Sequence, residues 1–257
     1  MIVARAEPAA ALEVLVRATG VVAWQRRGVF AAPVGAVDDV VLAAAADGVL
    51  AALDIGTGAQ RWSTELGSRL WIGAAAAGGI AYLGTAAGEL VAVSVADGTT
   101  RWRTPLRRGS VRTRPLLAGA IVCVGTASGA VVAVDADDGR LRWCAELGAL
   151  PAAGLACTGG TIVAGAADRR LHGLDVQDGV ERWTCATDGV IAGAPAASAA
   201  AVYCGSADGH LYVVDPASGR VLERHPLDAP ARGSLAAADD AVFIVSERGT
   251  AYAFAAR

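Results

Sequence analysis

The sequence predicts an all-β protein, a β-propeller of four-stranded antiparallel blades. The first observation behind this prediction is a repeat of about 40 residues, the length that four short strands and their turns require. The second is a series of short apolar runs separated by turn-forming residues, and the third is that Ala and Gly together make up more than a third of the chain. The repeat is marked by Trp24, Trp62, Trp102, Trp143 and Trp183, which are 38, 40, 41 and 40 residues apart.

The same pattern surrounds each of these Trp residues. A Gly stands four residues before each one, at Gly20, Gly58, Gly98, Gly139 and Gly179, and Gly219 continues the series although Glu223 takes the place of its Trp. Strand-like runs precede the last five of these Gly residues, at 50–54, 90–94, 131–135, 171–175 and 211–215. Further apolar runs lie at 40–44, 80–84, 121–125, 161–165, 201–205 and 241–245. Short turns containing Gly join the paired runs, which predicts a hairpin in each repeat.

The layout of one blade follows from residues 71–105. We expect an innermost strand near 71–76 and further strands near 79–84, 89–94 and 99–104. The small residues belong mainly to the first two strands, where blades converge on the axis. The Trp lies on the outermost strand, where neighbouring blades diverge and a large side chain is needed to fill the space.

The repeats predict a single propeller domain over residues 1–257, with units starting near 1, 39, 79, 120, 160, 200 and 240. The chain begins at the second strand of one unit and ends after the third strand of another, with five complete units between them. We favour seven blades, closed by pairing between the two terminal blades. Six or eight blades are the alternatives.

Composition excludes several classes of protein. The formal net charge is −3 and 18% of residues are charged, so no basic surface for nucleic acid is expected. Long uncharged runs at 70–88, 147–167 and 189–207 recur at one phase of the repeat and contain Gly or Pro, which indicates pairs of strands and no membrane span. The five Cys residues have no C-x-x-C spacing, and the first 20 residues lack the pattern of a secretory signal. We therefore expect free thiols and a cytoplasmic location.

The pattern Ala52-x-Asp54-x-x-Thr57-Gly58-x-x-x-Trp62 resembles the tryptophan-docking repeat of PQQ-like (quinoprotein-type) β-propellers. This resemblance implies that the Trp packs against the adjacent blade and that the Asp and Thr side chains hold the turn between the third and fourth strands. Quinoprotein dehydrogenases of this kind use longer chains, a calcium ion held partly by Asn, a catalytic Asp and an adjacent pair of Cys. This sequence contains no Asn and no Cys-Cys pair, so we expect no bound PQQ and no other cofactor.

No catalytic or metal-binding pattern emerges from the remaining residues. His172, His210 and His225 do not have the spacing of a metal site. Asp47, Asp168 and Asp208 fall in tight turns, where a carboxylate serves as a turn former. Gly-x-Ser-x-Gly at a strand-to-helix turn is also missing, so catalytic residues remain unknown.

One part of the chain is richer in Arg than the equivalent parts of the other repeats. Six Arg residues lie within residues 101–114, on an outer strand and on the link to the next blade. Such links surround the funnel mouth of a propeller, and Arg side chains near an aromatic ring bind carboxylate or phosphate groups. The candidate binding residues are Arg69, Trp71, Arg112, Arg114 and Arg232. The alternative interpretation is a solvated loop that keeps an Ala-rich surface soluble.

Two functions follow from these observations. The first is a non-catalytic platform whose funnel face binds a protein partner or a small anionic ligand. The second is a cofactor-independent enzyme, of the lyase or cyclase type found in bacterial secondary metabolism, with the funnel as its active site. Acid–base chemistry in such an enzyme would fall to Arg112, Arg114, Tyr82, Asp188 or His225.

Overall fold

A computed structural model describes residues 2–5, 11–16, 18–30, 35–237 and 241–256. These residues form 26 strands, and none of them is helical. The all-β prediction is therefore confirmed. Within the described ranges there is accordingly no helix long and apolar enough to cross a membrane.

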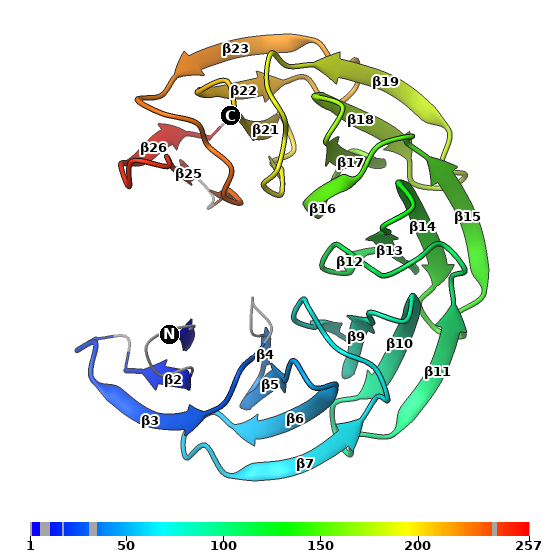
Figure 1. Cartoon of the computed structure of the whole chain (residues 1–257), viewed down its shortest axis with the longest axis vertical. Helices are drawn as coiled ribbons and strands as arrows, with labels where there is room; N and C mark the ends of the chain where they lie inside the picture. The colour runs from blue at the N-terminus through cyan, green and yellow to red at the C-terminus, as the bar shows by residue number, and fades with distance from the viewer. Residues whose placement is uncertain (1, 6–10, 17, 31–34, 238–240, 257) are drawn as a thin grey trace.

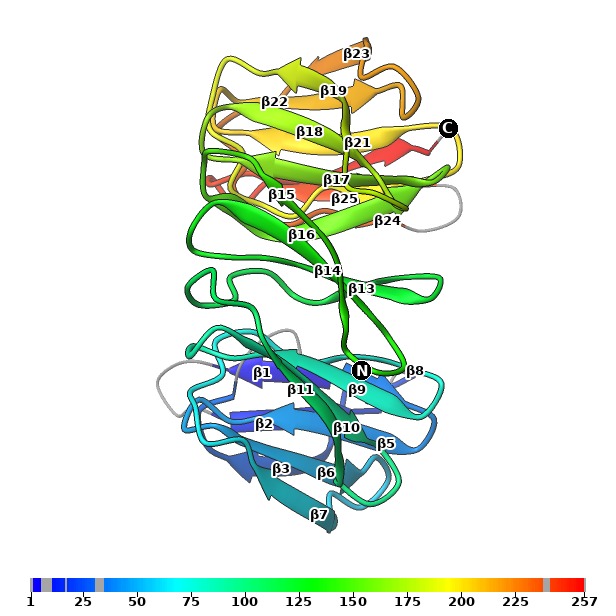
Figure 2. The ribbon, with the colours of Figure 1, turned by 90° about the vertical axis from the view of Figure 1, so that its right-hand side faces the viewer.

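The strands form seven antiparallel sheets that stand around a central axis as the blades of a propeller (Figure 1). Seen from the side in Figure 2, the first sheets (blue) lie at the bottom and the sixth sheet (yellow and orange) at the top. The sheets follow one another in the order of the chain, so each unit of the repeat packs on its sequence neighbours.

Five of the sheets have four strands each. They are β4 (Gly35–Val37), β5 (Val40–Ala44), β6 (Val49–Asp54) and β7 (Gln60–Glu65); β8 (Ala75–Ala77), β9 (Ile80–Gly84), β10 (Glu89–Ser94) and β11 (Thr100–Pro105); β12 (Leu116–Ala118), β13 (Ile121–Gly125), β14 (Ala130–Asp135) and β15 (Leu141–Glu146); β16 (Pro151–Thr158), β17 (Thr161–Ala166), β18 (Arg170–Asp175) and β19 (Glu181–Ala186); and β20 (Ala196–Ala197), β21 (Val202–Ser206), β22 (His210–Val214) and β23 (Val221–Pro226).

The first and last sheets have three strands each. They are β1 (Ile2–Arg5), β2 (Ala11–Leu15) and β3 (Val22–Arg27) at one end, and β24 (Ala236–Ala237), β25 (Ala241–Val245) and β26 (Ala251–Ala255) at the other. The expected pairing between the terminal blades is not found: among the described residues, β1–β3 and β24–β26 are separate sheets. The ring of ribbons is accordingly open between them (Figure 1).

The innermost strand of the third sheet is shorter than the sequence predicts. The expected strand near 71–76 is β8, which covers only Ala75–Ala77, whereas the other three strands of that sheet agree with the prediction to within one residue. The reason is that the preceding residues form a link across one face of the molecule, where the carbonyl of Arg69 accepts a hydrogen bond from the N–H of Ala86 in the β9–β10 turn. Residues 71–74 continue this link, and the strand begins only at Ala75.

Small residues allow the sheets to approach one another near the axis. A Cβ added to Gly193 would lie 2.0 Å from the carbonyl oxygen of Gly233, and one added to Gly84 would lie 2.2 Å from Cγ1 of Val111. Real side chains never approach so closely, so these positions accept only Gly. The high Ala and Gly content is thus a consequence of converging strands.

The periodic Trp residues connect each sheet to the next. Their Nε1 atoms donate hydrogen bonds of 2.8 to 3.0 Å to backbone carbonyls of the following sheet, from Trp24 to Ile55, Trp62 to Val95, Trp102 to Ala136, Trp143 to Val176 and Trp183 to Pro216. Each ring packs on the turn that precedes the outermost strand of that sheet. We call this the Trp-receiving turn and identify it by its Gly: Gly58, Gly98, Gly139, Gly179 and Gly219.

These glycines are required for two reasons. Gly98 has a φ of +75°, a region that L-residues with a side chain rarely occupy. A Cβ at Gly98 would also lie 2.6 Å from Cε3 of Trp62. Backbone conformation and ring packing therefore select the same residue.

The side chain of Asp54 holds its Trp-receiving turn closed. Its Oδ1 accepts hydrogen bonds from the N–H of Gly56, the N–H of Thr57 and the hydroxyl of Thr57. The hydrogen bond from Arg61 and those from Thr57 lower the pKa of Asp54 to about 2. The Asp and Thr therefore have the structural role that the family resemblance implies.

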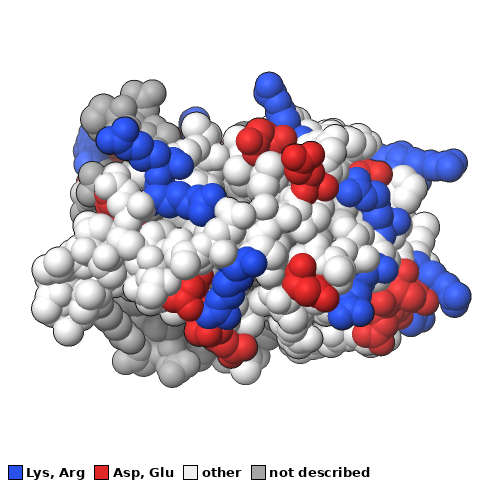
Figure 3. All heavy atoms as spheres, turned by 90° about the horizontal axis from the view of Figure 1, so that it is seen from below, with Lys and Arg blue, Asp and Glu red and all other residues white. Residues whose placement is uncertain are grey.

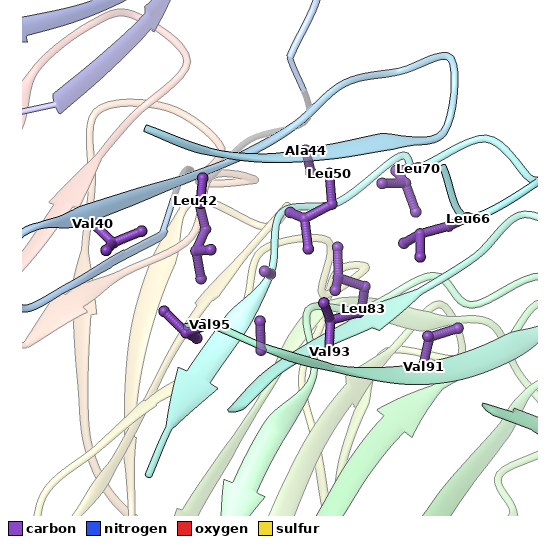
Figure 4. Packing of buried hydrophobic residues seen from close by; sticks show 13 residues of the cluster. Val40, Leu42, Ala44, Leu50, Leu66, Leu70, Leu83, Val91, Val93 and Val95 are labelled. Carbon is purple, nitrogen blue, oxygen red and sulfur yellow. The ribbon is translucent and has the colours of Figure 1, made fainter. Parts of the chain in front are cut away.

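The hydrophobic core is divided among the contacts between neighbouring sheets. Figure 4 shows one such contact, in which Leu42 and Leu50 of the second sheet face Leu83 and Val93 of the third. All four side chains are fully buried. Each four-stranded sheet thus buries a face on either side, and removal of one such sheet would expose its neighbours.

Charged residues lie on the outermost strands. On the side of the molecule seen in Figure 3, basic and acidic side chains alternate with uncharged surface. Arg61 of β7, for example, forms ion pairs with Asp39 at 2.5 Å and with Asp54 at 2.6 Å. Charges on an exposed edge strand discourage pairing with other molecules, so the outer rim is protected against aggregation.

We predict that Trp143→Ala lowers the free energy of unfolding by about 3–5 kcal/mol, because it removes a buried aromatic ring and leaves a cavity. Trp143 is only 7% exposed, whereas Trp71 is 46% exposed and serves as the control. Trp71→Ala should change stability by less than about 0.5 kcal/mol. Urea denaturation of the two variants measures the difference, and equal losses would contradict the packing role of Trp143.

A second prediction separates backbone strain from ring packing. Gly179→Ala and Gly119→Ala both place a side chain at positive φ, +72° and +62°. At Gly119 the new Cβ meets nothing within 4 Å, but at Gly179 it lies 2.5 Å from Cε3 of Trp143. We expect Gly119→Ala to cost about 1 kcal/mol and Gly179→Ala about 1–3 kcal/mol more. Equal unfolding free energies for both variants would show that the ring does not require Gly.

Candidate functional site

The candidate residues lie on the face of the propeller that carries the links between sheets. Each link enters a sheet by passing the turn between that sheet's second and third strands, and the backbones bond there. Examples are Ala86 N to Arg69 O, at 2.9 Å, and Ala127 N to Ser110 O, at 2.8 Å. These bonds fix the links on the rigid sheets, so side chains on them are held in place.

Trp71 and Arg112 form a stacked pair on this face. The guanidinium carbon of Arg112, in the link before β12, lies 5.1 Å from the centroid of the Trp71 ring, in the link before β8. The ring is 46% exposed, and Arg112 has no acidic partner among the described residues. A cation over an aromatic face is stabilised by the ring quadrupole, and stacking leaves the N–H edge of the guanidinium open to a ligand.

A cleft of about 710 Å³ lies next to this pair, between the first and second sheets. Its lining includes Arg69 and Trp71 of the link before β8, Arg26 and Arg27 at the end of β3, and Phe30 after that strand. Arg26 donates a hydrogen bond of 2.8 Å to Oε1 of Gln60. Asp47 is the single acidic residue among the described side chains that line the cleft, against three Arg residues, so this lining is positively charged.

The sequence analysis did not identify Arg26, Arg27 or Phe30. They belong to the outer strand and link of the first repeat, the element that in later repeats supplied the candidates. Searching every equivalent link for Arg and aromatic residues would have found them.

The other predicted binding residues lie apart from this pair or have structural contacts. Arg114 donates from Nε and Nη2 to the carbonyl of Ala74, at 3.1 and 3.0 Å, and burial lowers its pKa. It therefore ties the link before β12 to the inner part of the third sheet. Arg232 forms an ion pair with Glu247 at 3.3 Å and belongs to the link after β23, on the opposite arm of the open ring from β7 (Figure 1). Of the five candidates, Arg69, Trp71 and Arg112 come together.

The arginine cluster of residues 101–114 also disperses. Arg103 pairs with Glu89 at 2.6 Å and donates to the carbonyl of Leu66, and Arg108 pairs with Glu146 at 3.4 Å. These partners are distant in sequence. The cluster is thus largely a set of separate surface contacts.

The residues considered for acid–base catalysis do not meet in one pocket. Tyr82 is buried between sheets, where its hydroxyl donates to the carbonyl of Ala136 at 3.3 Å. Asp188 pairs with Arg224 at 2.9 Å, and His225 Nε2 lies 2.8 Å from Glu223. Each has its own partner, and no shared site for a substrate lies between them in the described part of the chain.

A polar network on the sixth sheet is the most connected group of titratable side chains. Oδ2 of Asp208 accepts from the hydroxyl of Tyr212 at 2.7 Å and from the N–H of Asp188 at 3.0 Å. Oδ1 of Asp208 lies 3.1 Å from Nδ1 of His210, and Arg224 stacks on the Tyr212 ring at 5.1 Å. Burial, and then the hydrogen bond to Asp208, raise the pKa of Tyr212 to about 12.

The described residues do not bring together the metal ligands that accompany a quinone cofactor. Among the described residues no group of three His, Cys, Asp or Glu side chains is placed to hold a metal ion. His172 is buried with Nδ1 2.7 Å from Glu181 and Nε2 3.2 Å from Asp168, and so makes a local contact within its own sheet. All five Cys are free, and burial raises the pKa of Cys123 and Cys204, which makes them unreactive thiols.

Comparison with known proteins identifies the family. A family model described as outer membrane protein assembly factor BamB matches residues 3–116 and 108–257, and so covers nearly the whole chain. The chain belongs to this family of PQQ-like β-propellers. No curated protein sequence matches it significantly.

Two solved structures support the propeller fold of this BamB-family chain. A computationally designed protein, Ika8, superposes with a TM-score of 0.85 at 20% identity over 95% of this chain and 77% of that one. BamB from Moraxella catarrhalis superposes with a TM-score of 0.61 at 18% identity over 98% of this chain and 95% of that one. At this level of identity the likeness concerns the fold alone.

The phenol of Tyr212 provides a test of the polar network. Because burial and then the bond to Asp208 raise the pKa of Tyr212 from about 10 to about 12, the stability linked to the neutral phenol is fully present below the lower value. This stabilisation is lost as the pH rises through the higher one. The ¹³Cζ resonance of Tyr212 can be assigned by its loss in Tyr212→Phe. We expect it to titrate near pH 12, and we expect Asp208→Asn to lower the midpoint of this titration. A midpoint at the ordinary value in the unsubstituted protein would contradict the network.

Proposed function

We propose that this protein is a non-catalytic scaffold that binds a protein partner at its link-bearing face. The stacked pair of Trp71 and Arg112 is the observation that carries this proposal. A large ring left nearly half exposed has a cost in water, and here it is held rigidly beside an Arg with no acidic partner among the described residues. Trp and Arg are the residue types most enriched among the positions that dominate binding energy at protein interfaces.

The chemistry of the site indicates the kind of partner. The cleft beside Trp71 has three Arg residues and one Asp, and its apolar lining includes Phe30 and several Ala residues. Its volume of about 710 Å³ lies within the usual range for a ligand pocket. A segment with one or two carboxylates next to an apolar side chain complements both properties, with a bidentate contact to Arg112 or Arg69.

The fold and the family are compatible with this role. Successive sheets packed through Trp provide a rigid frame, and binding to a preformed surface loses little conformational entropy. BamB, which gives the family model its description, is an assembly factor by that description. Five free thiols support our proposal of a reducing, cytoplasmic compartment.

Peptide selection tests the proposal. Peptides displayed on phage and selected on the intact protein should be enriched in Asp or Glu beside an apolar residue. We expect Arg112→Ala and Trp71→Ala each to weaken these peptides by about tenfold or more, because an Arg–carboxylate contact or an aromatic anchor is lost. Fluorescence polarisation measures the affinities, and thermal denaturation shows that the fold is unchanged.

The matched control is Arg232→Ala, which removes the same charge from the same face on the opposite arm of the ring. It should leave peptide affinity unchanged. Equal weakening by Arg112→Ala and Arg232→Ala would mean that only net charge attracts the peptides. Displacement of the peptides by a small dicarboxylate at micromolar concentration would instead favour a small anionic ligand.

A further inference from the structure

The first sheet has a Trp-receiving turn that no Trp occupies. The N–H of Gly20 donates to the carbonyl of Val16 at 2.8 Å, just as the N–H of Gly58 donates to Asp54, and the two glycines have φ values of +68° and +73°. A Cβ at Gly58 would lie 2.7 Å from the Trp24 ring, whereas one at Gly20 meets no described atom within 4 Å. Among the described residues, nothing occupies the space beside Gly20 that the Trp24 ring fills beside Gly58.

The last sheet has an apolar face that no sheet covers. Phe243 and Val245 of β25 are 46% and 53% exposed, and they pair across the sheet with Ala253 and Ala251. Val242 and Ile244, on the opposite face, are buried against the sixth sheet. In the third sheet the residue that corresponds to Phe243 is Tyr82, which is buried against the fourth sheet.

The same sheet also ends in an unpaired strand. In each four-stranded sheet the third strand pairs with a fourth, as β22 does with β23. β26 is the third strand of its sheet and has no such partner among the described residues. Its outer edge offers backbone N–H and carbonyl groups to a further strand.

We propose that the opening of the ring takes up one further propeller blade. An outer strand that precedes this blade pairs with β26, the blade itself covers Phe243 and Val245, and a Trp on its outermost strand enters the turn at Gly20. The five interfaces inside the chain are the model for this contact. In each of them two apolar sheet faces pack together, and the Trp of the earlier sheet enters the Trp-receiving turn of the later one.

Val245 restricts which blade fits. The third to sixth sheets have Gly at this position (Gly84, Gly125, Gly165 and Gly205), where the next sheet brings in a side chain such as Val111 or Ile191. Because Val245 fills that space, the partner blade must have a small residue there. A second copy of this chain does not meet the requirements, because its four-stranded sheets are already covered and its exposed last sheet has no Trp.

A polypeptide copied from the chain itself is the probe. Residues 136–197 contain an outer strand, a complete blade with Trp183 and one inner strand, and Pro151→Gly in the copy makes room for Val245. Mixed with the full chain, this probe should co-purify with it and slow amide hydrogen exchange in β26 and around Gly20 by about tenfold or more. The same probe with Trp183→Ala should lose the protection around Gly20.

Variants and a fusion complete the test. Phe243→Glu in the full chain should abolish binding of the probe, whereas Val190→Glu, at another exposed apolar side chain, should not. Fusing the probe to the C-terminus through a flexible linker removes any dependence on its folding alone, because the effective concentration is then high. Unchanged exchange in β26 of the fusion would overturn the proposal. A dimer of the unmodified chain that Phe243→Glu dissociates would also overturn it, in favour of a second copy.

Discussion

The contact between an indole ring and the Gly turn of the next sheet determines most of this structure. Its hydrogen bond fixes where each sheet lies relative to its neighbour, and its Gly must have a positive φ and no side chain. The contact has a direction, because the Trp is on the earlier sheet and the turn on the later one. A chain that repeats it every 40 residues or so builds a curved row of sheets, each held by its neighbours.

This constraint leaves few positions for chemistry. Strand residues are occupied by packing between sheets, and some must be small, as the 2.2 Å approach of a Cβ at Gly84 to Val111 shows. Functional side chains are therefore confined to the links, which are held by backbone hydrogen bonds to the strand turns. Trp71 illustrates the division: it is the one Trp outside the 40-residue series, and the one that is substantially exposed.

Most of the fold followed from the sequence because the relevant interactions are local or periodic. Strands such as β9, β10 and β11 were placed to within one residue. The signals that predict them, alternation of apolar and polar residues and Gly in the turns, lie within about ten residues of sequence. The inner strand β8 was placed too early because the course of the link before it, which is bonded to the β9–β10 turn through Arg69 and Ala86, depends on tertiary structure. The predicted pairing between the terminal blades was wrong for a similar reason. Counting repeats does not specify how the terminal sheets lie relative to each other.

The candidate site was less predictable than the fold. The Arg cluster appeared to be one feature because its members are adjacent in sequence, yet Arg103, Arg108 and Arg114 contact three different distant groups. Conversely, Arg26 and Phe30 were missed because they reach the cleft from another repeat. A binding surface made from successive links joins residues about 40 positions apart, so each link has to be compared with its equivalents in all repeats.

The junction between the sixth and seventh sheets differs from the others. Glu223 replaces the periodic Trp, so no indole fixes the last sheet, and its attachment depends on an apolar cluster that includes Tyr203, Val213 and Ile244. A ring contact of 4.9 Å between His225 and Phe254 supplements this cluster. Apolar packing is less directional than a hydrogen bond from an indole, so the last sheet has more freedom to adjust than the others. That freedom suits a sheet whose other face is exposed and apolar, because its position can then follow whatever blade covers Phe243 and Val245.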